Sequence, residues 1–126
     1  MEIRSTIMKD KNLRTHTVSG VLAVDQLLKH LRGIYASPDF QSDMDVLWDL
    51  RDADFSAISA ADVESVRDLV KDHWGLSGKS KAALIVSGDQ DFGMSRMYEI
   101  LMDQVTENKV MVFRDRKEAY KWIENR

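Results

Sequence analysis

The sequence predicts a single α/β domain over residues 1–126, with a mixed, mostly parallel sheet and helices packed over it. Three observations carry this prediction. Residues 2–8 alternate between apolar and polar side chains, as a half-buried strand does. Residues 82–86 form an uninterrupted apolar run, which is typical of a central strand covered on both faces. Helical patterns alternate with the strands in the order β-β-α-β-α-β-α-β-α, which is typical of right-handed parallel crossovers.

The first two strands are expected to form an antiparallel hairpin. Residues 2–8 place Ile3, Ser5 and Ile7 on one face, and a polar turn separates them from a threonine- and valine-rich strand over residues 13–19. The hairpin is locally basic, which is typical of a solvated edge that discourages pairing with other chains. The basic residues concerned are Arg4, Lys9, Lys11 and Arg14.

The spacing of apolar residues, together with residues typical of helix ends, predicts a helix, a strand and the start of a second helix after the hairpin. Apolar residues recur at helical intervals over residues 24–35, before the chain's one proline. Residues 44–50 are the next predicted strand, and the acidic stretch 49–55 is its exit loop. Ser59 has the form of a helix N-cap with an acid, Asp62, three residues on.

The central strand is followed by the clearest helical pattern in the chain. Gly75 and Gly78 mark the end of the preceding helix. The strand stops at residues 87–89, and a helix is expected from about residues 92–93, ahead of a last strand at 110–113 and a short final helix. The apolar stripe of the helix before that last strand comprises Met94, Met97, Tyr98, Leu101, Met102 and Val105.

The composition excludes several classes of function. The net charge of -3 provides no basic field for nucleic acid. There is no cysteine, which excludes disulfides, thiol catalysis and thiolate metal sites. No apolar run approaches the roughly 18–20 residues that span a bilayer, so no membrane insertion is expected. The first residues lack the apolar core of a signal peptide, and a cytoplasmic location is therefore expected.

Three stretches of the chain resemble the SpoIIAA-like branch of the STAS-type proteins. They are VLWDLRDADF, KAALIVSGDQDFGMSRMYE and VFRDRKEAYKWI, within a resemblance that extends from about Gly20 to Ile123. The most specific elements are Phe92-Gly93-x-x-Arg96 and the closing pattern Phe113-Arg114-Asp115, Ala119 and Trp122. The resemblance implies a STAS/Sec14-like fold, which is usually a non-enzymatic interaction or ligand-binding module.

The resemblance also draws attention to Ser59. Anti-anti-sigma relatives carry a phosphorylatable serine at the start of the helix after the corresponding strand, and Ser59 is the nearest match. A phosphate there would be favoured by the free N–H groups of the helix. Those relatives place an aspartate, serines and a glycine together, whereas this chain has alanines at residues 57, 60 and 61. A plain N-cap explains Ser59 fully.

A ligand-binding edge is expected where the central strand ends and the next helix begins, since ligands of open α/β sheets bind there. The predicted ligand-binding residues are Gly88, Phe92, Gly93, Arg96 and Met97. Arg96 would hold an anionic group, or else pair with a nearby acid. The glycines are more simply explained as turn residues. The methionine stripe is first explained as core packing against the sheet, and the alternative is the lining of a groove.

No catalytic or metal-binding constellation is predicted, and no cofactor is expected. Asp49, Asp52 and Asp54 follow a strand and could hold Mg²⁺, but solvated loop acids explain them as well. The three histidines, at positions 16, 30 and 73, are far apart in sequence and are expected at the surface or at a strand edge.

The sequence therefore favours a non-catalytic regulatory or interaction module that binds a protein partner or itself. The alternative is a small carrier or sensor of an apolar or amphipathic ligand, with the methionine stripe lining a Sec14-like groove and Arg96 engaging the polar group. An enzyme that uses the acids around Asp49 is the least supported reading.

Overall fold

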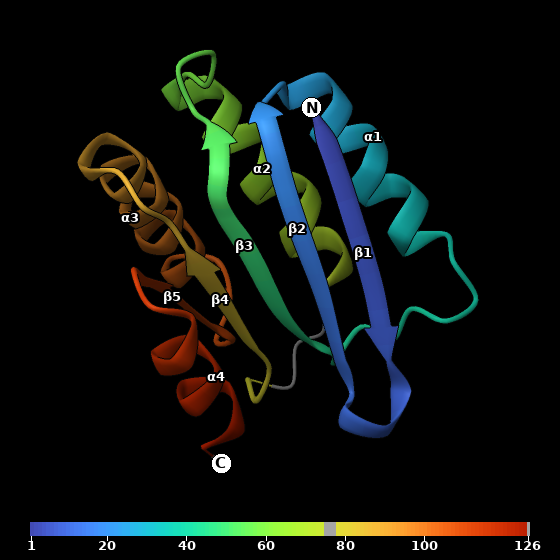
Figure 1. Cartoon of the computed structure of the whole chain (residues 1–126). Helices are drawn as coiled ribbons and strands as arrows, with labels where there is room; N and C mark the ends of the chain where they lie inside the picture. Colours follow the sequence, from blue (N-terminus) through green and yellow to red (C-terminus); the bar gives the residue numbers. More distant parts are fainter. Residues whose placement is uncertain (75–77, 126) are drawn as a thin grey trace.

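The computed structural model describes residues 1–74 and 78–125, and one five-stranded sheet runs through them (Figure 1). The strands lie in the order β1-β2-β3-β4-β5. The first strand is antiparallel to the second, and every later pair is parallel. The predicted α/β fold with a mixed, mostly parallel sheet is confirmed.

The strands are β1 Glu2–Met8, β2 Leu13–Val21, β3 Asp45–Asp54, β4 Lys81–Ile85 and β5 Lys109–Phe113. The helices are α1 Val24–Tyr35, α2 Ala60–His73, α3 Asp89–Asp103 and α4 Arg116–Glu124, with a 3-10 turn, Lys9–Lys11, inside the hairpin. The end of α2 predicted at Gly75 lies outside the described residues, and the described helix ends at His73.

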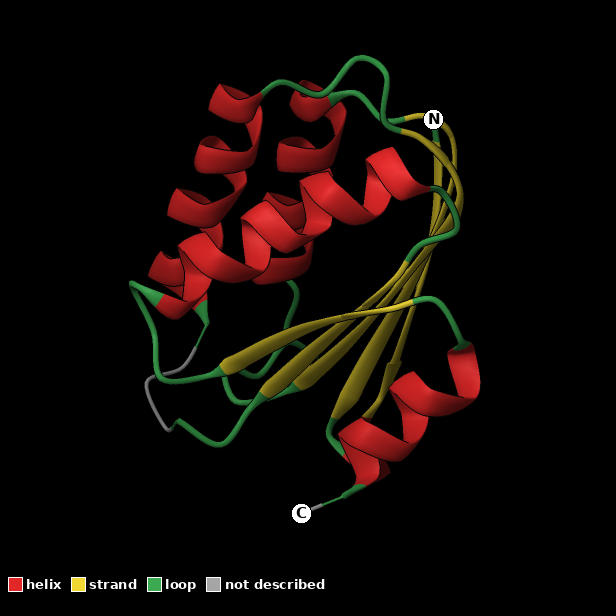
Figure 2. Cartoon of the chain, turned by 90° about the vertical axis from the view of Figure 1, so that its left-hand side faces the viewer, coloured by secondary structure: helices red, strands yellow, loops and turns green. Residues whose placement is uncertain are grey.

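The helices divide between the two faces of the sheet. Helices α1, α2 and α3 cover one face, called the helix face below, and α4 covers part of the opposite face (Figure 2). Because side chains alternate along a strand, β3 sends Val46 and Leu50 into the larger core under α1–α3 and Leu47 into the smaller core under α4. The sheet is therefore buried from both sides at its centre, as the apolar run of β4 predicts.

Two predicted boundaries are wrong. The acidic stretch after residue 50 is not a loop but the second half of β3, because Ser19–Val21 of β2 pair with Asp52–Asp54. In this half Ala53 is buried while Asp52 and Asp54 are exposed, so the acids are simply the solvent-facing half of a strand. Helix α3 begins at Asp89 rather than near residue 92.

The early start of α3 has a local cause. Gly88 is its N-cap in extended conformation, and the Phe92 N–H already donates to the Gly88 carbonyl at 2.9 Å. Asp89 and Asp91 in the first turn favour the helix through its dipole. Asp89 is further held by Arg114 of the loop after β5, at 2.8 Å.

Lys81, the first residue of β4, fastens α4 to the sheet. Its ammonium donates to the carbonyls of Trp122 and Asn125 at the end of α4 and lies 5.1 Å from the Trp122 ring centre. A cation at these carbonyls also complements the helix dipole. The Lys81 side chain thus holds the C-terminal end of α4 against the start of β4.

Candidate functional site

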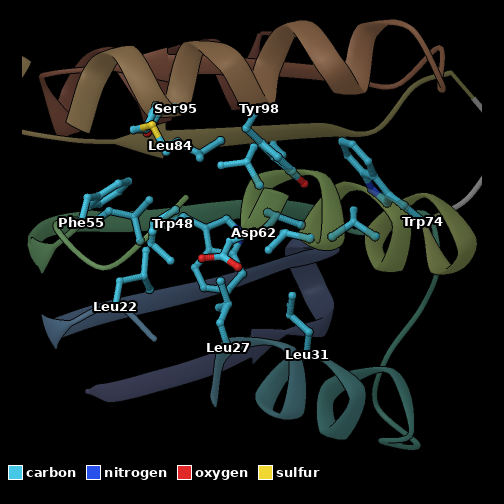
Figure 3. Close-up of a pocket in the computed structure, with 18 of the residues that line it drawn as sticks. Leu22, Leu27, Leu31, Trp48, Phe55, Asp62, Trp74, Leu84, Ser95 and Tyr98 are labelled. Atoms are coloured by element: carbon cyan, nitrogen blue, oxygen red, sulfur yellow. The ribbon is translucent and has the colours of Figure 1, made fainter. Parts of the chain in front are cut away.

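A cavity of about 100 Å³ lies between the helix face of the sheet and helices α1–α3 (Figure 3). Strands β2, β3 and β4 form its floor, and all three helices contribute to its walls. The lining is aliphatic and aromatic apart from two ionisable residues and three hydroxyl-bearing ones, which are Arg14, Asp62, Tyr35, Ser95 and Tyr98. We call this space the helix-face cavity.

The sequence explains why space remains here. The floor carries the small side chain of Ala82, which pairs with Val46 of β3 and stands two residues before the larger Leu84, and α2 presents mainly valines. The volume is somewhat smaller than an engineered cavity of about 150 Å³ that takes up benzene, so it suits an apolar group of up to roughly six carbons.

Arg14 is the most unusual residue of the lining. It is only 2% exposed, and within residues 1–74 and 78–125 no carboxylate pairs with it. Its guanidinium lies 5.5 Å from the ring centres of both Tyr35 and Phe40. Burial lowers the pKa of Arg14, and the nearby Tyr35 hydroxyl offsets part of this effect. An arginine still remains protonated at neutral pH, so the cavity contains a buried positive charge.

Three buried polar atoms of the lining make no hydrogen bond to any described residue. They are Arg14 Nε, the Tyr35 hydroxyl oxygen and Ser95 Oγ. The Tyr35 hydroxyl lies beside the Arg14 guanidinium without meeting hydrogen-bond geometry. Buried polar groups are nearly always paired, since an unpaired one costs about 1–3 kcal/mol. Their gathering around one cavity therefore needs an explanation.

Tyr98 brings a further hydroxyl to the same region. Its side chain extends from α3 toward α2 (Figure 3). Burial and, to a smaller extent, the nearby Tyr35 raise the pKa of Tyr98, and Arg14 offsets part of this effect. Burial likewise raises the pKa of Tyr35. Both side chains are therefore neutral phenols that can donate a hydrogen bond.

A chain of hydrogen bonds connects Arg14 to the protein surface. Arg14 Nη1 lies 3.1 Å from His16 Nε2, Ser5 Oγ lies 2.7 Å from His16 Nδ1, and Ser5 Oγ also lies 2.8 Å from His30 Nε2. An arginine can only donate, so His16 Nε2 accepts and its Nδ1 carries the proton. Burial, together with the charges of Arg14 and His30, holds the pKa of His16 well below its ordinary value.

The positions of Arg14 and His16 contradict two sequence predictions. Arg14 was expected on a solvated edge and His16 at the surface or a strand edge, yet both are at most 2% exposed. The alternation of side chains along β2 could have revealed this burial. Val18 faces the core, so His16 and Arg14, two and four positions earlier, lie on the same face of the strand. His16 also stacks on Trp48, with ring centres 4.2 Å apart.

None of the five predicted ligand-binding residues lines the helix-face cavity. Gly88 caps α3, Phe92 packs at the margin of the larger core, and Gly93 is exposed. Arg96 is ion-paired with Glu99 at 2.7 Å on the surface of α3, and Met97 is half-buried. The same helix instead sends Met94, Ser95 and Tyr98 into the lining. A ligand-binding role for the five stays a prediction.

Ser59 is the N-cap of α2, as predicted. Its hydroxyl accepts from the Asp62 N–H at 3.1 Å, and the Asp62 carboxylate accepts from the Ser59 N–H at 3.0 Å, which completes a capping box. Ser59 is exposed. Its phosphorylation stays a prediction.

The acids around β3 are engaged in structure. Asp49 is held by two hydrogen bonds from Arg51, at 2.9 and 2.7 Å, with Arg116 at 3.6 Å, and these interactions lower the pKa of Asp49. Asp54 accepts from the Ser56 N–H. Across the described ranges, no cluster of three or more histidines and acids has an arrangement suited to a metal ion.

Comparison with known proteins supports the fold. No family model matches the chain, and no curated protein matches it. Among solved structures, it is similar to the crystal structure of an uncharacterised protein of the DUF3478 family, with a SpoIIAA-like fold, from Shewanella loihica PV-4. The two chains are 17% identical, the match covers 96% of this chain and 93% of the other, and the TM-score is 0.59. The chain therefore has a SpoIIAA-like fold, as the resemblance in its sequence implies. Within the described residues, no helix combines the length and apolar character needed to cross a membrane.

Proposed function

We propose that the chain is a non-catalytic carrier or sensor that holds a small apolar or amphipathic molecule in the helix-face cavity. The observation that carries this proposal is an apolar cavity whose lining includes three unsatisfied buried polar atoms. A molecule with an apolar body and a polar group would fill the space and pair those atoms. The SpoIIAA-like fold, as a STAS-type module, is compatible with this role.

This proposal develops the alternative derived from the sequence, with a different set of residues. The ligand's polar group would meet Arg14 rather than Arg96, because Arg14 is buried in the lining whereas Arg96 is half-exposed and paired. Binding to a protein partner or to a second copy stays a prediction. A concentration-dependent elution volume would support that role, and a strict monomer that captures no protein would count against it.

The first test is native mass spectrometry of gently purified protein, with a denatured spectrum beside it. A bound mass that disappears on denaturation is expected under this proposal. Toluene is the second probe, because its six-carbon ring is the size of apolar group that the cavity suits and it needs no polar partner. Toluene should shift the amide resonances of residues around the cavity, including Val66 on α2.

Two substitutions on α2 provide a matched pair. Val66→Phe adds bulk at a half-buried position in the lining and should abolish toluene binding. Leu69→Phe adds bulk at a half-buried position that packs against the core but does not line the cavity, so it should leave binding intact. If both variants bind toluene as the unmodified protein does, toluene does not occupy the helix-face cavity, and a protein that binds neither toluene nor a molecule detected by native mass spectrometry would count against the cavity as a binding site.

A further inference from the structure

The buried charge in the helix-face cavity indicates the chemical class of the ligand. We infer that the cavity binds a monocarboxylate with a small apolar body, and that Arg14 pairs with its carboxylate. This inference rests on the proposed function and adds the identity of the polar group. The first step is the placement of Arg14, which is 2% exposed, lines the cavity and has an unpaired Nε.

Among the residues that the structure describes, none supplies a counterion for the charge of Arg14. The contacts that remain are one hydrogen bond to neutral His16 and the faces of two aromatic rings. Aromatic faces attract a cation but do not replace a carboxylate. A buried charge of this kind is strongly destabilising unless an anion reaches it. The described chain supplies no such anion, so the ligand is the natural source.

The neighbouring hydroxyls fit a carboxylate. A carboxylate has two oxygens that accept several hydrogen bonds, and a guanidinium can meet it with two parallel N–H groups. The unpaired Tyr35 hydroxyl lies beside the guanidinium, and Tyr98 is close enough to influence its pKa. Both are neutral phenols, so each can donate to the second oxygen. Arg14 Nε, which has no hydrogen-bond partner among the described residues, is a further N–H donor for the carboxylate.

His16 positions the arginine. Its Nε2 accepts one guanidinium N–H, and its ring is fixed by stacking on Trp48 and by the bond between Nδ1 and Ser5. The guanidinium is therefore oriented before a ligand arrives, which reduces the entropy lost on binding. His16 itself does not line the cavity.

The rest of the lining limits the ligand to one negative charge. Arg14 lies near the start of β2, opposite Val46, whereas Asp62 opens α2, which follows the far end of β3. The Trp74 side chain bonds to the Met44 carbonyl, so the last turn of α2 returns to the start of β3. Arg14 and Asp62 consequently lie apart in the lining, where Asp62 occupies a position between Phe55 and Trp74 (Figure 3). A second carboxylate would meet Asp62 and be repelled.

The experiment compares charged and neutral probes of equal shape. Benzoate is paired with benzamide, and hexanoate with hexanamide, and each is titrated by calorimetry and by amide chemical shifts. The carboxylate of each pair should bind at least about tenfold more tightly than its amide. A difference of this size is expected from one hydrogen bond between charged groups. Equal binding within each pair would overturn the inference while leaving the proposed function intact. Failure of all four probes and of toluene would overturn the proposed function itself.

Three variants test whether Arg14 causes the preference for carboxylates over amides. Arg14→Met keeps a long side chain and removes the charge, so it should abolish the preference for carboxylates while toluene still binds. Tyr35→Phe removes one hydroxyl and should weaken benzoate about fivefold. Arg96→Met removes an exposed, paired arginine outside the lining and should change nothing. A carboxylate preference that survives in Arg14→Met, or that disappears in Arg96→Met, would contradict the assignment to Arg14.

Discussion

Lowering the pH from about 7 to about 5 should destabilise this protein through His16. The side chain is 1% exposed, and burial, the charge of Arg14 and the proximity of His30 all lower its pKa in the folded state. In the unfolded chain its pKa returns to about 6.5. Below that value the unfolded state binds a proton that the folded state does not, so the free energy of unfolding falls as the pH falls.

The size of the effect follows from this difference. One additional proton bound by the unfolded state changes the free energy of unfolding by about 1.4 kcal/mol per pH unit. Because His16 is mostly neutral in both states at pH 7, the loss accumulates mainly below the unfolded pKa. A histidine that stays neutral in the folded state down to pH 5 therefore costs about 2 kcal/mol over this interval. His30, whose pKa is also lowered but which is less buried, adds a smaller amount.

Urea unfolding at several pH values between about 7 and 5 measures the effect. The unmodified protein should lose about 2 kcal/mol or slightly more, and His16→Gln should lose much less, whatever its stability at neutral pH. His30→Gln should keep most of the pH dependence. A flat profile for the unmodified protein, or an unchanged slope in His16→Gln, would refute the claim that His16 is buried and neutral.

Three further predictions concern stability at neutral pH, each measured by urea unfolding. Ser59→Ala should cost about 1 kcal/mol through loss of the N-cap, whereas Ser59→Asp should cost little; equal losses would contradict the capping role. Leu31→Ala should cost about 2–5 kcal/mol, because Leu31 is 1% exposed in the larger core, and a loss below about 1 kcal/mol would place it outside that core. Arg14→Met should raise the free energy of unfolding by about 1 kcal/mol or more, since it removes a buried charge that no described carboxylate pairs with; a drop of several kcal/mol would reveal an unrecognised partner.

The fold was predictable because local patterns agree with one another. The alternation in β1, the apolar run of β4 and the spacing over α1 each define one element, and all three are consistent with the same layered α/β arrangement. The bounds of α1, Val24–Tyr35, match the prediction. The second half of β3 was missed because Asp52 and Asp54 suggest a loop, although their alternation with Ala53 is that of a strand with one solvated face.

The binding site was harder to predict than the fold. Arg14 and His16 lie on a strand whose polar residues suggested an exposed edge, and only the register of β2 against β3 shows that they face the core. Tyr35, at the end of α1, joins them only through tertiary packing. Sequence reasoning therefore favoured the exposed arginine at position 96 and overlooked the buried one.

The order of the strands in the sheet has a consequence for how the protein is made. Because β1 to β5 follow one another in space as they do in sequence, each pairing joins neighbours along the chain, and the sheet can grow as the chain is synthesised. The helix face is complete once α3 and β5 have formed. Among the described elements, α4 is the one that covers the opposite face, with Leu47, Ala83 and Ile85, and α4 is synthesised after all five strands. A nascent chain that ends before Arg116 thus carries a finished cavity on one side and a bare apolar strip on the other, the kind of surface that chaperones bind.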